Sequence, residues 1–207
     1  MGRASQAQAA EHREQLVAAA SRLFREQGFQ VSLAELTSAV GLTTGGFYRH
    51  FESKDALLGE ATAHAFQELR ALLNDFEAAH SGDHGAGRTA LIDYYLSPGH
   101  RDDAAHGCPV SGLNATVSHQ PEPSQAKRHY VEGVQKLADW LESAPSASEQ
   151  APTDGAPGRA AAQVSDEAYA TLCTMVGALV LARATNGSAV SERILTSARG
   201  ALAAADE

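Results

Sequence analysis

The residues best suited to chemistry in this chain are polar and aromatic side chains gathered in one short stretch, TTGGFYRHF, at positions 43–51. Tyr48, Arg49 and His50 offer a phenol, a guanidinium and an imidazole. All three groups can hydrogen-bond to phosphate oxygens, and Tyr48 can also reach a base edge. The stretch is therefore typical of a helix that enters a groove of DNA.

The start of the same stretch suits close contact with DNA. Thr43 or Thr44 can cap a helix, and its first backbone N–H groups can then face a phosphate. Gly45 and Gly46 carry no side chain, so the backbone can approach a DNA surface, although each glycine weakens a helix by roughly 1 kcal/mol. The alternative interpretation is a glycine-containing turn followed by an ordinary amphipathic helix.

The neighbouring residues favour a helix-turn-helix. Ser32 and Glu35 form a capping box that starts a short helix, and Gly41 supplies a left-handed turn after it. In the second helix, Phe47 and Phe51 are four residues apart, so they share a face that we expect to point inward. Two short helices joined by a tight glycine turn are the motif itself.

The run LVAAASRLFREQGFQVSLAELTSAVGLTTGGFYRHFESKDALLGEA, at 16–61, resembles the DNA-binding domain of the TetR/AcrR family of bacterial transcriptional regulators. The resemblance covers about 46 residues without a gap, and the rest of the chain matches the family only loosely. It implies an all-α protein with a three-helix DNA-binding domain at 1–53 and a ligand-binding and dimerisation domain at 54–207. The residues expected to contact DNA are Ser32, Thr43, Thr44, Gly45, Gly46, Tyr48, Arg49, His50 and Lys54.

Lys54 is the least expected of these residues on local grounds. Ser53 caps a long helix that runs to about Ala79, and a lysine beside that cap opposes the helix dipole. An anion outside the protein would explain the lysine, and the family resemblance implies that this anion is a DNA phosphate. The alternative is a solvated surface lysine.

The charge distribution permits DNA binding at one end of the chain. The net charge is −9. Residues 1–54 nevertheless carry six basic against five acidic groups, while the remainder carries ten against twenty. No stretch has the pattern of a signal peptide or the roughly 18 uninterrupted apolar residues of a membrane span, so we expect a cytoplasmic protein without a membrane partner. No spacing typical of a catalytic or cofactor site is found, so we predict no enzyme, no metal and no cofactor.

The acidic remainder of the chain predicts further helices that could surround an unidentified small-molecule inducer. Pockets between bundle helices are mainly apolar with a few polar groups. Cys108 can line such a pocket, or it can be a reactive sensor at a helix start beside His106, while a metal site with His100 lacks a recognised pattern. The residues expected to contact the ligand are Phe66, Tyr94, Tyr95, Cys108, Tyr130 and Trp140.

The last two predicted helices, at about 166–184 and 191–204, follow a proline-containing segment at 143–164 that we interpret as a flexible linker. The first of the two is apolar around most of its circumference, so it must be buried on more than one face. The pair resembles the helices through which TetR/AcrR proteins form dimers. The expected interface residues are Leu172, Met175, Val176, Leu179, Val180, Ile194, Leu195, Ala198 and Leu202.

Together these patterns predict a homodimeric regulator, most simply a repressor that binds a palindromic operator and responds to a ligand or to stress. The alternative function is a protein that senses small molecules or electrophiles and whose DNA-binding head no longer acts.

Overall fold

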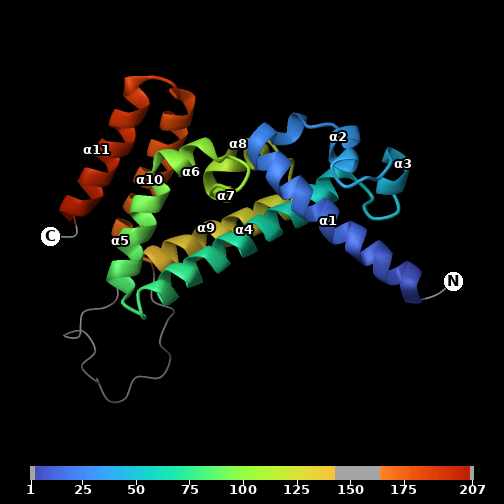
Figure 1. Ribbon diagram of the computed structural model, residues 1–207, viewed down its shortest axis with the longest axis horizontal. Helices are drawn as coiled ribbons and strands as arrows, with labels where there is room; N and C mark the ends of the chain where they lie inside the picture. The colour runs from blue at the N-terminus through green and yellow to red at the C-terminus, as the bar shows by residue number, and fades with distance from the viewer. Residues whose placement is uncertain (1–2, 143–163, 206–207) are drawn as a thin grey trace, which may run out of the picture. The chain divides into compact units, whose positions relative to one another are not determined.

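The computed structural model describes residues 3–142 and 164–205 of the 207-residue chain (Figure 1). All regular secondary structure in these two ranges is helical, which confirms the predicted all-α class. The predicted linker at 143–164 lies outside the described residues except for Val164. The helices are α1 (Arg3–Gln27), the 3-10 helix η1 (Gly28–Gln30), α2 (Leu33–Ser38), α3 (Thr44–Phe47), α4 (Lys54–Ala79), α5 (His84–Tyr95), α6 (Pro98–Asp102), α7 (Pro109–Gly112), α8 (Asn114–Ser118), α9 (Gln125–Leu141), α10 (Asp166–Ala184) and α11 (Ala189–Ala205).

Local capping residues set the ends of the first helices. The left-handed φ of +71° at Gly28 ends α1, and the φ of +70° at Gly41 makes the turn after α2. At the start of α2, the Ser32 side chain accepts from the Glu35 N–H, and the Glu35 carboxylate accepts from the Ser32 N–H. The predicted capping box and the predicted turn at Gly41 are therefore confirmed.

The predicted recognition helix is shorter than expected. We expected it to run to Phe51, but α3 covers four residues and ends at Phe47. The two glycines of α3 have low helix propensity. After them the backbone forms the shorter hydrogen bonds of turns, from an N–H to the carbonyl three residues earlier. The N–H of Arg49 bonds to Gly46 O, and the N–H of His50 bonds to Phe47 O. Residues 48–50 therefore follow α3 as consecutive turns rather than as a regular helix.

The described chain forms two compact units, each built from two stretches of sequence. Unit 1 contains residues 1–72 and 102–134, and unit 2 contains 73–101 and 135–207. Helices α4 and α9 each contribute residues to both units. The two units do not coincide with the two domains predicted at 1–53 and 54–207. That domain boundary stays a prediction about function.

The core of unit 1 combines the helix-turn-helix with residues from far along the chain. Helix α8 packs against η1, and α7 packs against α1. The Thr116 hydroxyl lies 3.6 Å from the position that a Cβ on Gly28 would take. The later segment thus completes the core around the predicted helix-turn-helix. The buried residues of this core include Leu16, Phe24, Leu36, Phe47, Phe51, Leu57, Leu113, Val117 and Ala126.

Unit 2 is built around α10, which packs against α5 and α11. Arg88 of α5 is buried; its Nε donates to Leu141 O at 3.1 Å, and its Nη2 donates to the Thr171 hydroxyl at 3.2 Å. By length and composition α10 could cross a membrane, but the core helix of a globular protein passes the same test. Burial of Leu172 and Met175 is consistent with such a core helix.

A single glutamate joins the end of α9 to the start of α10 in unit 2. The Glu142 carboxylate accepts a hydrogen bond from the Ser165 N–H at 2.7 Å. The Glu142 carbonyl pairs with Nε2 of His84 at 3.1 Å, and Nδ1 of His84 lies 3.1 Å from the Glu77 carboxylate. Glu142 and Ser165, which flank residues 143–164, are thereby held close together.

Candidate nucleic-acid interface

Two buried aromatic rings orient the end of α3 and the turns after it. Phe47 and Phe51 are 0% and 4% exposed and stack with their centroids 5.9 Å apart. Tyr48 contacts Phe47 edge-on but is 61% exposed, and Arg49 is exposed as well. The apolar face is therefore anchored, and the phenol and guanidinium are left in solvent where a groove could accept them.

The glycines of α3 are not required by the packing of the protein itself. A Cβ on Gly45 would have no neighbour nearer than the Thr43 hydroxyl at 4.0 Å. One on Gly46 would meet that hydroxyl at 3.5 Å, an ordinary contact, and neither residue has a positive φ. Alanine would fit at both positions and would favour the helix. The glycines are thus consistent with an external surface that must come close.

The two helix caps have exposed hydroxyl groups. Ser32 Oγ accepts from the Glu35 N–H, and Thr43 Oγ1 accepts from the Gly46 N–H, each at 3.1 Å. Because these bonds use only the oxygen as acceptor, each hydroxyl still has a hydrogen to donate. Both residues can therefore cap their helices and bond to a phosphate at the same time.

Basic and titratable groups gather beside the end of α3. Arg13 of α1 lies over the Phe51 ring, 4.6 Å from its centroid, and pairs with Glu60. The His50 ring lies edge-on to His12, 6.5 Å between centroids. Partial burial, then His12, Arg13 and Arg49, lower the pKa of His50 below its ordinary value. The cluster thus repels added positive charge and would attract a phosphate.

Lys54, which we expected to contact DNA, has hydrogen-bond partners inside unit 1 that the sequence did not reveal. Its Nζ donates to Phe29 O at 2.6 Å and to Val31 O at 2.5 Å, and lies 4.1 Å from the Phe29 ring centroid. Desolvation lowers the pKa of Lys54. These carbonyls explain a lysine at the start of α4 without an external anion. A phosphate contact through its third N–H stays a prediction.

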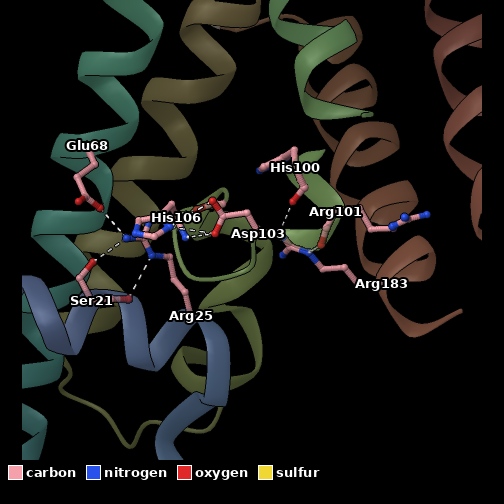
Figure 2. A network of polar contacts seen from close by, with 9 residues as sticks. Ser21, Arg25, Glu68, His100, Arg101, Asp103, His106 and Arg183 are labelled. Carbon is pink, nitrogen blue, oxygen red and sulfur yellow. Dashed lines mark hydrogen bonds and ion pairs between the residues drawn. The ribbon is translucent and has the colours of Figure 1, made fainter. Parts of the chain in front are cut away.

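Arg25 is a functional candidate that the sequence did not reveal (Figure 2). Its buried guanidinium donates to Ser21 O at 3.1 Å, to Gly107 O at 3.0 Å and to the Glu68 carboxylate at 2.6 Å. It therefore ties α1 to α4 and to the chain just before Cys108. No local pattern distinguishes this arginine from the exposed Arg22 of α1, because two of its partners are distant in sequence.

Three of the residues expected to bind a ligand lie in unit 1. Phe66 and Tyr130 pack edge-on at 5.8 Å, and the Tyr130 hydroxyl donates to Val110 O at 2.6 Å. Burial, and to a lesser degree Cys108, raises the pKa of Tyr130 to about 12. Cys108 itself is 4% exposed.

The group beside Cys108 differs from the expectation for an activated thiol. His106 pairs through Nδ1 with the Asp103 carboxylate at 3.0 Å, and both side chains are largely exposed (Figure 2). A protonated His106 would thus be balanced by Asp103. Within the part of the chain that the structure describes, no group of three or more histidine, cysteine or acidic residues could hold a metal ion.

The other three expected ligand residues lie in unit 2. Tyr94 stacks on His100 at 5.2 Å, Tyr95 contacts the same ring at 4.6 Å, and Trp140 lies edge-on to His84 at 5.0 Å. The His100 carbonyl accepts from Arg183 at 3.0 Å (Figure 2). That these six residues contact a ligand stays a prediction.

The residues expected at a dimer interface divide into two sets. Five of them are buried within the chain, namely Leu172, Met175, Leu179, Leu195 and Leu202. Val176, Ile194 and Ala198 are half-buried, and Val180 is 41% exposed. The exposed side of α10 also presents Tyr169, Cys173 and Leu181. The exposed side of α10 is therefore a surface that a second copy could cover, and the five buried residues pack beneath it within the chain.

Comparison with known proteins agrees with this geometry. Residues 16–61 match the family described as bacterial regulatory proteins, tetR family. Over 84 residues the chain is 33% identical to the HTH-type transcriptional regulator AcrR of Shigella flexneri, a match that spans 40% of this chain and 39% of that protein.

Solved structures show the same fold over nearly the whole chain. A TetR transcriptional regulator from Chloroflexus aurantiacus aligns with a TM-score of 0.70 at 22% identity, covering 95% of this chain and 94% of that one. A TetR-family regulator from Agrobacterium tumefaciens aligns with a TM-score of 0.67 at 19% identity, covering 93% and 97%.

The fold and the capped α2–turn–α3 element define an all-helical helix-turn-helix protein. More narrowly, the helix-turn-helix segment at 16–61 matches the TetR/AcrR family of bacterial regulators, and the rest of the chain shares the fold of solved members of that family.

Proposed function

We propose that this protein is a transcriptional regulator that binds double-stranded DNA through α3 and the turns after it. The observation that carries the proposal is the exposure of Tyr48 and Arg49 beside two glycines that internal packing does not require. The remaining proposed contacts are Ser32, Thr43, Thr44 and His50. Phosphate contacts would orient the protein, and Tyr48 would contribute to base reading.

The proposed DNA target is palindromic because the protein would act as a homodimer. Two recognition helices must stand about 34 to 36 Å apart to enter successive major grooves of one DNA face. The exposed apolar side of α10, with Tyr169, Val180 and Leu181, supports pairing of two copies. A self-complementary interface of this kind makes the two half-sites inverted repeats.

The proposed regulation is repression that an inducer relieves. A ligand lowers DNA affinity only by its greater affinity for the conformation that misplaces the two heads. The aromatic and thiol groups expected to contact the ligand would favour an apolar inducer with one or two polar groups. Arg25 offers a route from the Cys108 segment to α1, because it bonds to Gly107 O.

The test is to incubate the protein with sheared genomic DNA of its source organism and to sequence the retained fragments. The proposal predicts enrichment of an inverted repeat. Tyr48→Phe and Arg49→Gln should each reduce retention while leaving the helical circular dichroism spectrum unchanged. Retention of random fragments only, equal for wild type and both variants, would overturn the proposal and leave a sensing protein with an inactive head.

A further inference from the structure

A groove of about 530 Å³ lies in unit 1, on the side of α8 and the first half of α9. Its lining is mainly apolar. The residues that matter below are Asn114, Val117 and Ser118 from α8, and Lys127, Tyr130 and Val131 from α9. The volume is within the range of sites that hold small organic molecules.

The apolar wall of this groove combines a rigid ring with an exposed aliphatic side chain. Tyr130 is held edge-on against Phe66 and bonded to Val110 O, so its ring cannot turn freely. Val131 is 54% exposed beside it. A rigid, partly open apolar surface binds a flat or aliphatic body with little loss of side-chain entropy.

The groove also has a place for one negative charge. Lys127 Nζ lies 3.0 Å from the Glu122 carboxylate, and the Ser124 N–H donates to that carboxylate at 3.2 Å. The hydrogen bond from Lys127, aided by Arg128, lowers the pKa of Glu122. Glu122 is itself largely exposed, so a ligand anion could take its place beside the two cations.

The same groove reaches the core of the DNA-binding head. Val117 is 3% exposed and belongs to the core that contains Phe24 and Phe47. Helix α8 packs against η1, which leads directly into α2. A molecule that binds against Val117 therefore contacts the core on which the helix-turn-helix packs, within a single unit.

We propose that this groove binds a small amphipathic organic acid, with its apolar body on Val117, Tyr130 and Val131 and its anionic group at Lys127 and Arg128, and that binding changes DNA affinity. The effect on DNA affinity rests on the proposed function above, whereas the binding of the organic acid does not. The site is separate from the six residues expected to bind the inducer, except for Tyr130.

The binding test uses the fluorescent probe 8-anilinonaphthalene-1-sulfonate, which has an apolar aromatic body and one anionic group. The variant is Val131→Glu, which removes an apolar contact and adds a repelling charge. Val190→Glu on α11 is the matched control, because Val190 is also a helical valine that is 54% exposed. We expect affinity to fall about tenfold, or about 1.4 kcal/mol, in Val131→Glu only. Asn114→Tyr, which fills the groove from α8, should weaken binding as well.

Equal affinity in wild type, Val131→Glu and Asn114→Tyr would place the probe elsewhere and overturn the site. A loss of equal size in Val190→Glu would overturn it too, because binding would then follow surface charge in general. The charge is tested with N-phenyl-1-naphthylamine, which keeps the body of the probe and lacks its sulfonate. Arg128→Gln should weaken the sulfonate probe about threefold, as expected for an exposed charge pair, and leave the neutral one unchanged. Equal effects on both probes would overturn the anion position.

The regulatory clause is tested by measuring DNA affinity with and without saturating sulfonate probe. We expect a change of about threefold or more in wild type, a scale typical of allosteric coupling, and no change in Val131→Glu. If wild type binds its DNA and the DNA affinity does not change with the probe, the proposed effect on DNA binding is overturned. If the protein retains no DNA at all, the proposed function fails, and the fluorescence titrations still decide whether the groove is a binding site.

Discussion

Arg25 in the last turn of α1 donates through Nη1 to the main-chain oxygen of Gly107, 82 residues later, at 3.0 Å. The same guanidinium holds Glu68 of α4 at 2.6 Å. One side chain therefore links the chain beside Cys108 to both α1 and α4.

The first prediction compares Arg25→Lys with Arg22→Lys on the same helix. Lysine cannot reproduce the planar fork, so the bonds to Gly107 and Ser21 would not all be kept. We expect Arg25→Lys to lower the free energy of unfolding by about 2 kcal/mol, as is usual for a broken buried polar network. Arg22 is exposed, so its replacement should change stability by less than about 0.5 kcal/mol. Urea denaturation measures the free energy of unfolding of both variants. Equal losses would show that the buried guanidinium of Arg25 does not stabilise the fold more than an exposed arginine does.

Gly45→Ala should change stability and DNA affinity in opposite senses. The Cβ has room, so the helix should gain about 0.5 kcal/mol. Because the methyl group would face the proposed DNA surface, affinity should fall about tenfold, the equivalent of 1.4 kcal/mol. Gly85→Ala is the control: Gly85 is the second residue of α5, and its Cβ would also meet only the oxygen of the capping residue, at 3.5 Å. It should stabilise without affecting DNA binding. Unchanged affinity in Gly45→Ala would remove α3 from the interface.

Arg49→Gln and Lys54→Gln should separate a DNA contact from an internal one. Each phosphate contact contributes roughly 0.9 to the slope of log affinity against log salt, so Arg49→Gln should lower that slope by about this amount at unchanged stability. Lys54→Gln should instead cost about 2 kcal/mol of stability, because its charge-assisted bonds to Phe29 and Val31 are lost. Measurement of both quantities in both variants decides the assignment. If Lys54→Gln lowers the slope of log affinity against log salt by the same roughly 0.9 and leaves stability unchanged, Lys54 contacts a phosphate after all.

Acidification should strengthen DNA binding through His50 and slightly weaken the fold. The pKa of His50 lies below its ordinary value of 6.5, so the unfolded chain binds this proton more readily. Its stabilising effect is therefore present above pH 6.5 and is lost as the pH falls through the lowered pKa. DNA phosphates favour the charged ring, so binding should take up a proton, and affinity should rise as the pH falls from about 7.5 to 5.5. His50→Gln should flatten both pH profiles. An equally steep affinity profile in that variant would assign the effect to other groups, His12 first.

The buried and exposed sides of α10 give different outcomes for the same substitution. Val180 is 41% exposed, so Val180→Glu should keep unit 2 folded and yield monomers that bind DNA poorly. Leu179 is 0% exposed, so Leu179→Glu buries a charge and should unfold unit 2. Light scattering after size-exclusion chromatography reports the oligomeric state, and circular dichroism reports the fold. A dimer that persists in Val180→Glu would place the interface elsewhere.

Features set by neighbouring residues could be predicted from the sequence. The Ser32–Glu35 capping box, the left-handed glycine at 41 and the buried Phe47–Phe51 pair all depend on contacts within a few residues. The family resemblance at 16–61 added the functional meaning of these features.

Features that depend on distant chain segments could not be predicted. Lys54 meets the carbonyls of Phe29 and Val31, and Val117 completes a core formed mainly by the first 65 residues. Both sides of α10 are apolar, so periodicity alone does not tell which one faces inward. The packing of α5 and α11 against α10 decides that question.

The Glu142–Ser165 hydrogen bond has a consequence for how this lineage of proteins can change. Because the two flanking residues are held together in the folded chain, the connection between them needs only to bridge a short gap. Each doubling of such a connection costs only about 0.6 kcal/mol of closure entropy. Insertions and deletions between α9 and α10 are therefore nearly neutral for folding.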